Sequence, residues 1–187
     1  MATIAIDKDG VCVNLTKKVL SFLQQSFPHR KDEFVMENVK RFKFEENFPG
    51  VGEVVENYFK TDEAFRNLEV IEGCIESIKE LHTMGHTIFL CTAPVRAPNC
   101  FYNKSEWFFN NLPFLKNQLV ITHDKTIIKA DYLIDDKAEI TGINSSPEWK
   151  HILFNQPWNQ YKQEGYHVRI DGWRNVVDYF WEIGDVE

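Results

Sequence analysis

The sequence lacks the long apolar runs and the excess of positive charge that would assign it to a membrane or to nucleic acid. None of its hydrophobic stretches approaches the ~20 residues that a membrane-spanning helix needs. Its formal net charge is −7, which argues against general binding to nucleic acid or to an anionic membrane surface. An anionic substrate must therefore be attracted by a local group of cations or by a metal ion.

Paired cysteines, targeting signals and repeats are also missing. The four cysteines, Cys12, Cys74, Cys91 and Cys100, are scattered without a C-x-x-C motif, which is typical of reduced thiols. The N-terminal residues show no signal-peptide pattern, so we expect a cytoplasmic protein. With 187 residues, of which 43% are hydrophobic, the chain can form one domain with a substantial core, or one domain carrying an insertion.

The apolar stretch 3–6 leads directly into Asp7, Asp9 and Gly10. A short continuous apolar run that ends in turn residues is typical of a strand buried on both faces of a parallel sheet. Asp7 would then stand at the carboxyl end of the strand, where open α/β sheets bind ligands. Residues two apart on a strand share a face, so both carboxylates can point into one crevice. For this stretch alone, a simple Asx-type turn is the alternative.

The rest of the chain predicts a Rossmann-like parallel α/β sheet flanked by helices. Apolar spacing predicts helices over 13–27, 74–84, 104–112 and 173–183, with a loop over 93–99. Apolar runs predict strands at 87–92, 119–121, 132–136 and 151–154, the last being the final strand that we expect. The Phe-rich stretch 29–72 predicts short helices only. We therefore divide the chain into a core, 1–14 and 73–187, and a small helical cap, 15–72, inserted after the first strand.

Polar residues stand at or just beyond the ends of four predicted strands. They are Asp7 with Asp9, Thr92, Lys125, and Asp135 with Asp136. Because the carboxyl ends of parallel strands share one edge, these side chains should meet there. Four carboxylates repel one another unless a cation neutralises them, and hard oxygen ligands favour Mg²⁺ over zinc. The hydroxyl of Thr92 and the ammonium group of Lys125 indicate that a phosphate oxygen is the second ligand of this site. Asp135 and Asp136 alone could instead cap a helix.

These motifs, in this order, resemble the four motifs of the haloacid dehalogenase superfamily of phosphatases. Several stretches are similar to the 5′(3′)-deoxyribonucleotidases of that superfamily, namely 91–94, 102–104, 124–136, 140–142 and 149–154. The similarity covers nearly the whole chain and is weakest over the cap residues 29–65. It implies an enzyme that dephosphorylates deoxyribonucleoside 5′(3′)-monophosphates with Mg²⁺ as its cofactor and a nucleotide as its small-molecule substrate.

The resemblance also implies roles for single residues. Asp7 would be the nucleophile that becomes an aspartyl-phosphate, and Asp9 the general acid and then the general base. That role needs a pKa nearer neutrality than a free aspartate has. If Asp9 is protonated, the negative charges of Asp7, Asp135 and Asp136 are balanced by the positive charges of Mg²⁺ and Lys125. The Mg²⁺ ion would be held by the Asp7 side chain, the Asp9 backbone carbonyl and Asp136. Asp135 would mainly contact these ligands and not the ion itself. The phosphoryl oxygens would be bound by Thr92, the Ala93 amide, Lys104 and Lys125.

The cap would supply the nucleoside pocket, which we assign to Leu15, Phe42, Phe44, Phe65 and Arg96. Leu15 stands where the resemblance predicts an aromatic residue, Ala93 where it predicts a small hydroxyl residue, and Lys8 where it predicts an apolar one. For each phenylalanine a purely structural place in the core is the alternative. Lys104 and His123 could likewise be ordinary surface residues.

Other functions fit part of the pattern. One is a phosphatase of the same superfamily that acts on another small phosphomonoester. Another, of a different class, is a phospho-receiver or metal-binding module without turnover, although a receiver places its acid pair first and lacks a cap. The sequence leaves open the base preference, the choice between deoxy and ribo sugars and between 5′ and 3′ phosphates, and the oligomeric state. The aromatic C-terminal helix fits either the core or the face of a homodimer.

Overall fold

The computed structural model describes residues 1–184, and the sheet that it shows has six parallel strands in the order β3-β2-β1-β4-β5-β6. The strands are β1 (Thr3–Ile6), β2 (Thr87–Thr92), β3 (Leu119–Ile121), β4 (Tyr132–Asp135), β5 (Lys150–Phe154) and β6 (Val168–Ile170). The first strand lies between β2 and β4, and Ile4, Ala5 and Ile6 are fully buried. Asp7 therefore stands in the middle of the sheet's carboxyl edge.

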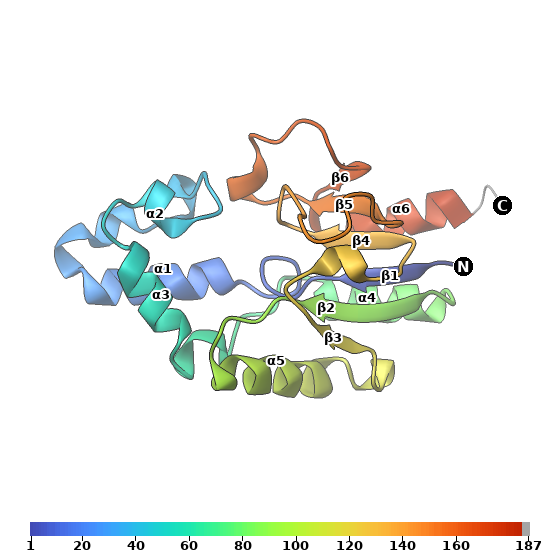
Figure 1. Ribbon diagram of the computed structural model, residues 1–187, viewed down its shortest axis with the longest axis horizontal. Coiled ribbons are helices and arrows are strands. Elements are labelled where there is room, and N and C mark those ends of the chain that lie inside the picture. The colour runs from blue at the N-terminus through green and yellow to red at the C-terminus, as the bar shows by residue number, and fades with distance from the viewer. Residues whose placement is uncertain (185–187) are drawn as a thin grey trace.

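Helices α4 (Cys74–Thr83), α5 (Pro98–Asn111) and α6 (Gly172–Gly184) flank the sheet (Figure 1). Short 3-10 helices occupy Pro113–Leu115 (η4), Lys125–Ile127 (η5) and Pro157–Asn159 (η6). Helices α4 and α6 pack against each other. The buried face of α6 consists of Trp173, Val176, Val177 and Phe180. This aromatic face thus belongs to the core of the same chain. The expected α/β class, with a parallel sheet flanked by helices, is confirmed.

The stretch after β1 forms the helical cap. It contains α1 (Leu15–Ser26), α2 (Phe44–Asn47) and α3 (Gly52–Phe59), with 3-10 helices at Pro28–Glu33 (η1), Met36–Asn38 (η2) and Glu63–Phe65 (η3). In Figure 1 these helices lie beyond the carboxyl ends of the strands. The two connections to the core run side by side, since Asn14 N–H donates to the Glu69 carbonyl at 2.8 Å. The boundaries at residues 14 and 73 remain a prediction.

Two local predictions are wrong. Helix α5 begins at Pro98 and not at residue 104, because proline is well suited to the first helical turn, where its missing N–H is not needed. The preceding Ala97 is extended, as residues before proline usually are. The sheet also has a sixth strand, β6, which is only three residues long and carries Arg169 between two apolar residues. A strand this short gives too little periodicity to be recognised.

Within residues 1–184, no helix combines the length and the apolar character that crossing a bilayer demands.

Candidate active site

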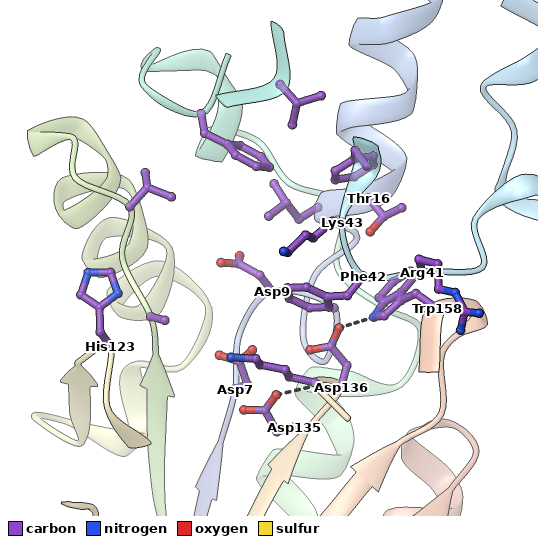
Figure 2. A pocket seen from close by; sticks show the side chains of 18 of the residues that line it. Asp7, Asp9, Thr16, Arg41, Phe42, Lys43, His123, Asp135, Asp136 and Trp158 are labelled. Carbon is purple, nitrogen blue, oxygen red and sulfur yellow. Dashed lines mark hydrogen bonds between the residues drawn. The ribbon is translucent and has the colours of Figure 1, made fainter. Parts of the chain in front are cut away.

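Three carboxylates meet at the middle of the carboxyl edge of the sheet. Asp7 follows β1, Asp135 ends β4, and Asp136 comes next in the chain. Each offers an oxygen atom that lies within 4.8 Å of the oxygens from the other two, and all three residues are buried. Figure 2 shows them together at one end of a pocket. The pairing of β1 with β4 brings these acids together across more than a hundred residues of chain.

Gly10 makes room for this cluster. Its backbone has φ +84°, a conformation that favours glycine, and a Cβ atom there would lie 2.7 Å from Cγ of Asp136. The loop around it is fastened by the last third of the chain. Gln156 Nε2 donates to the Gly10 carbonyl at 2.7 Å, and Trp173 Nε1 donates to the Val11 carbonyl at 2.8 Å. Two side chains from the C-terminal third of the chain therefore hold the D-x-D-G loop.

Lys125 lies between two of the carboxylates. Its Nζ is 2.8 Å from Oδ1 of Asp7 and 2.6 Å from Oδ2 of Asp135. Burial alone would lower the pKa of Lys125, but the two carboxylates outweigh burial and raise it above the usual value. The indole of Trp149 donates to the Lys125 carbonyl at 3.1 Å and holds its backbone. Lys125 is thus a permanent positive charge at the base of the site.

Asp9 is bound by two other lysines, and both are fully buried. Lys104 forms an ion pair with Oδ2 of Asp9, and its Nζ also donates to Oγ1 of Thr92 at 2.8 Å. Lys8 Nζ lies 3.2 Å from Oδ1 of Asp9 and 5.3 Å from the ring centroid of Trp107. Both oxygens of Asp9 therefore contact an ammonium group.

The protonation of the carboxylates differs from the expected pattern. Burial alone would raise the pKa of Asp9, but Lys104 and Lys8 outweigh burial and lower it to about 2. Burial, helped by Asp135 and Asp9 and opposed by Lys125, raises the pKa of Asp7 to about 6. In the metal-free site Asp9 is therefore ionised, whereas the charge count with a protonated Asp9 applies to the site with Mg²⁺ bound. Burial favours the protonated form of Asp7 and of Asp136, whereas neighbouring cations outweigh burial at Asp9 and keep it ionised.

A cavity of about 470 Å³ opens above the carboxylates, between the cap and the core. This volume lies in the range of pockets that bind small ligands, roughly 300–1,000 Å³. The cap contributes an apolar wall made of Leu15, Val39, Phe42, Phe44, Val55, Phe59 and Phe65. Phe59 and Phe65 are stacked with ring centroids 5.7 Å apart, and Phe42 is 52% exposed. The pocket thus has an acidic floor and an aromatic wall.

The comparisons with known proteins agree with this geometry. The model of one family, described as 5′ nucleotidase, deoxy (pyrimidine), cytosolic type C protein, matches residues 1–182. The chain belongs to this family. The human mitochondrial 5′(3′)-deoxyribonucleotidase is 31% identical to it over 189 residues, which cover 94% of this chain and 82% of the human protein. The family predicted from the sequence is confirmed, and membership makes the chain a hydrolase of the haloacid dehalogenase superfamily.

Solved structures of other haloacid dehalogenase hydrolases share the fold. A hydrolase of the haloacid dehalogenase family from Deinococcus radiodurans, crystallised with phosphate and sodium, superimposes with a TM-score of 0.64 at 12% identity. The match covers 97% of this chain and 96% of that one. The D,D-heptose 1,7-bisphosphate phosphatase of B. bronchiseptica, complexed with magnesium and phosphate, gives a TM-score of 0.55 at 9% identity, covering 98% and 99%. At these identities the likeness shows the fold alone.

The acidic cluster of this family member can hold a metal ion. All its donors are hard oxygens, the class that Mg²⁺ prefers. Within residues 1–184, no hydrogen bond reaches Oδ2 of Asp7, Oδ1 of Asp136 or the Asp9 carbonyl. Burial and the neighbouring Asp135 and Asp7 raise the pKa of Asp136 well above its usual range, so a cation would relieve the crowding. The residues present therefore fit the implied ion.

The residues assigned to the site from the sequence fall into three groups. Lining the pocket are Asp7, Asp9, Leu15, Phe42, Phe44, Phe65, Ala93, Lys125, Asp135 and Asp136. Thr92 and Lys104 are buried and do not line it, and Lys104 contacts both Thr92 and Asp9. Arg96 is exposed and does not line the pocket; its neighbour Val95 does. His123, expected at the surface, is exposed at the rim of the cavity.

Several lining residues have no motif that marks them. Trp158 donates through Nε1 to Oδ2 of Asp136 at 2.7 Å, as Figure 2 shows, although it lies in a stretch that reads as a loop. Lys43 enters the pocket from the cap, and Lys137 directly follows the acid pair. A lone tryptophan among polar loop residues is the one signal that could have drawn attention to Trp158.

Proposed function

We propose that this enzyme dephosphorylates deoxyribonucleoside 5′(3′)-monophosphates in a Mg²⁺-dependent reaction that forms an aspartyl-phosphate on Asp7. One observation carries the proposal: the acidic cluster with Lys125 forms the floor of a cavity whose opposite wall is aromatic. The floor suits a phosphate with a metal ion, and the wall suits a flat base, because stacking tolerates any base. The name of the human relative supports the same substrate class.

In the first step, a carboxylate oxygen of Asp7 attacks phosphorus, and the bond to the ester oxygen breaks. Lys125, the Thr92 hydroxyl, the Ala93 amide and Lys104 would bind the phosphoryl oxygens, with positions fixed before the reaction. Mg²⁺, bound by Asp7, Asp136 and the Asp9 carbonyl, would supply the charge that lets a dianion approach the carboxylates. The leaving oxygen takes a proton from Asp9, and the freed nucleoside departs.

The proton on Asp9 would arrive with the substrate. In the empty site Lys104 and Lys8 keep Asp9 ionised. A phosphate dianion adds negative charge beside Asp9 and competes for Lys104, and both effects raise the pKa of the carboxyl group. After the first step Asp9 is again a carboxylate and can take a proton from the water that attacks phosphorus. The bond between phosphorus and the Asp7 oxygen then breaks, so that free phosphate leaves and the Asp7 carboxylate is restored.

A substrate panel tests the function. Phosphate release would be measured for dUMP, dTMP, dGMP, UMP, 3′-dUMP and a sugar phosphate, each with Mg²⁺ and with EDTA. We expect metal-dependent turnover that favours the deoxynucleotides. Turnover of the sugar phosphate alone would keep the phosphatase chemistry and reject the nucleotide. No turnover of any compound would favour a phospho-receiver or a metal-binding module.

Phe65→Ala should weaken binding of nucleotides selectively. Phe65 lines the pocket, is only 3% exposed and is stacked on Phe59, so it forms and supports the aromatic wall that a base would contact. Stacking on a base contributes about 1–3 kcal/mol, so we expect KM for dUMP to rise about tenfold or more. KM for methyl phosphate, which has no base, should stay within twofold.

The matched control is Phe48→Ala, which removes an equally buried cap phenylalanine that packs on Phe34, with ring centroids 5.2 Å apart, and does not line the pocket. It should lower the melting temperature without the selective rise in KM. Equal changes in KM for both substrates in Phe65→Ala would remove Phe65 from the base pocket.

A further inference from the structure

Lys43 is a cation of the pocket that the proposed chemistry does not use. It belongs to the cap loop 40–43 and lines the cavity, and Figure 2 shows its side chain directed into the pocket, on the side of Asp9. In the part of the chain that the structure describes, residues 1–184, Lys43 forms no ion pair. Asp7 and Asp135 are paired with Lys125, and Asp9 is paired with Lys104 and Lys8.

The loop that carries Lys43 is held in place by one amide. Asn47 Oδ1 accepts from the backbone N–H groups of Lys40 at 2.6 Å and Arg41 at 2.8 Å. Asn47 Nδ2 donates to the carbonyls of Arg41 at 2.7 Å and Lys43 at 2.9 Å. Four hydrogen bonds from a single side chain fix the shape of the loop before any substrate arrives. A loop ordered in advance loses little entropy on binding.

The nearest acid in the sequence does not neutralise Lys43. Both carboxylate oxygens of Glu45 accept backbone hydrogen bonds at the start of α3, from Gly50 N–H at 2.9 Å and from Gly52 N–H at 2.7 Å. These bonds lower the pKa of Glu45 and turn its charge toward the helix. The ammonium group of Lys43 is therefore left for a ligand.

Filling the pocket would remove water from this ammonium group. Lys43 is exposed in the empty cavity, whose cap wall is mostly apolar and includes Leu15 and Phe42, so a ligand there would replace water around the ammonium group. A charged group that loses water without gaining a hydrogen-bond partner is strongly destabilised. A substrate that fits this pocket should therefore present an oxygen acceptor to Lys43, away from the phosphate that is cleaved.

We propose that Lys43 is a specificity-determining residue that binds an oxygen acceptor on the nucleoside part of the substrate, and that Asn47 is its positioning residue. The inference rests on the proposed function, because it requires a nucleotide in the pocket. Two sources offer this chemistry: a carbonyl oxygen of the base, and a second phosphate group on the sugar.

Steady-state kinetics of three substrates separates these sources. The substrates are dUMP, deoxyuridine 3′,5′-bisphosphate and methyl phosphate, and the enzymes are the wild type, Lys43→Met, Asn47→Ala and the control Lys40→Met. Lys40 belongs to the same loop but lies outside this cavity. A lost hydrogen bond to a charged group should raise KM about tenfold to a hundredfold. For Lys43→Met we expect that rise, with kcat and the KM of methyl phosphate unchanged.

The substrates for which KM rises in Lys43→Met identify the acceptor. A rise for both nucleotides indicates the base carbonyl, and a rise for the bisphosphate alone indicates the second phosphate. Asn47→Ala should repeat the pattern of Lys43→Met, whereas a merely structural role would change all three substrates together.

Two results would overturn the inference: an equal rise in KM for methyl phosphate, which places Lys43 at the cleaved phosphate, or no change in Lys43→Met. If the wild type hydrolyses methyl phosphate but neither nucleotide, the proposed function itself fails and this inference fails with it.

Discussion

Asp7→Asn is expected to abolish turnover while leaving the fold intact, and to stabilise the metal-free protein at neutral pH. Turnover should fall by at least about four orders of magnitude, the scale seen when a covalent nucleophile is removed. Asparagine has the same shape, and its Oδ1 can still accept from Lys125. The stability gain follows from the pKa of Asp7, which burial raises to about 6, so that its charge is unfavourable in the folded state at pH 7.5.

The two halves of this expectation are measured separately. Phosphate release from dUMP reports turnover, and thermal melts in EDTA at pH 7.5 report stability. Asp32→Asn makes the same chemical change at an exposed position of the cap and should alter neither quantity. Wild-type turnover in Asp7→Asn would show that Asp7 is not the nucleophile. A lower melting temperature would show that its charge is not unfavourable in the folded state.

Mg²⁺ should stabilise the protein strongly at pH 7.5 and only weakly at pH 5. Without metal, the folded state keeps a proton on Asp7 up to about pH 6, whereas the unfolded chain releases it near 3.8. Stability is therefore lost as pH rises through this window, by about 3 kcal/mol for Asp7 alone. The raised pKa of Asp136 extends the loss to higher pH. Asp9 has the opposite sign, because its pKa is lowered to about 2, but its effect is confined to pH below about 4.

A bound cation replaces these protons, so its stabilising effect grows with pH. Melting temperatures at pH 5 and 7.5, each with MgCl₂ and with EDTA, test this expectation. Asp136→Asn should remove most of the metal effect at pH 7.5, and EDTA should reduce the turnover of dUMP by at least about a hundredfold. A melting temperature that does not respond to Mg²⁺ at pH 7.5 would argue against a metal at this cluster.

The sequence was sufficient for the central strands and for the acids that follow them. Apolar runs such as 87–92 and 132–135 are local signals, and the parallel arrangement then dictates that Asp7, Thr92 and Asp135 share an edge. The start of α5 was missed because a Pro–Asn pair is typical of loops as well as of first helical turns. Strand β6 was missed because three residues carry little periodicity.

The electrostatics of the site could not be predicted in the same way. The pKa of Asp9 depends on Lys104, which lies on α5 some ninety-five positions away in the sequence. The role of Lys8 as a second partner depends on its complete burial beside Trp107. Trp158 reaches Asp136 from a loop. These are contacts between distant segments, and no spacing in the sequence reports them.

The fastening of the D-x-D-G loop has a consequence for synthesis on the ribosome. The first ten residues carry Asp7, the proposed nucleophile, but Asp136, Gln156 and Trp173 must be present before the loop has its neighbours. A growing or prematurely terminated chain that stops before residue 132 would carry Asp7 and Asp9 without a metal cluster. Hydrolytic activity would thus appear only near the end of translation, and a partly made chain could not act on the nucleotide pool of the cell.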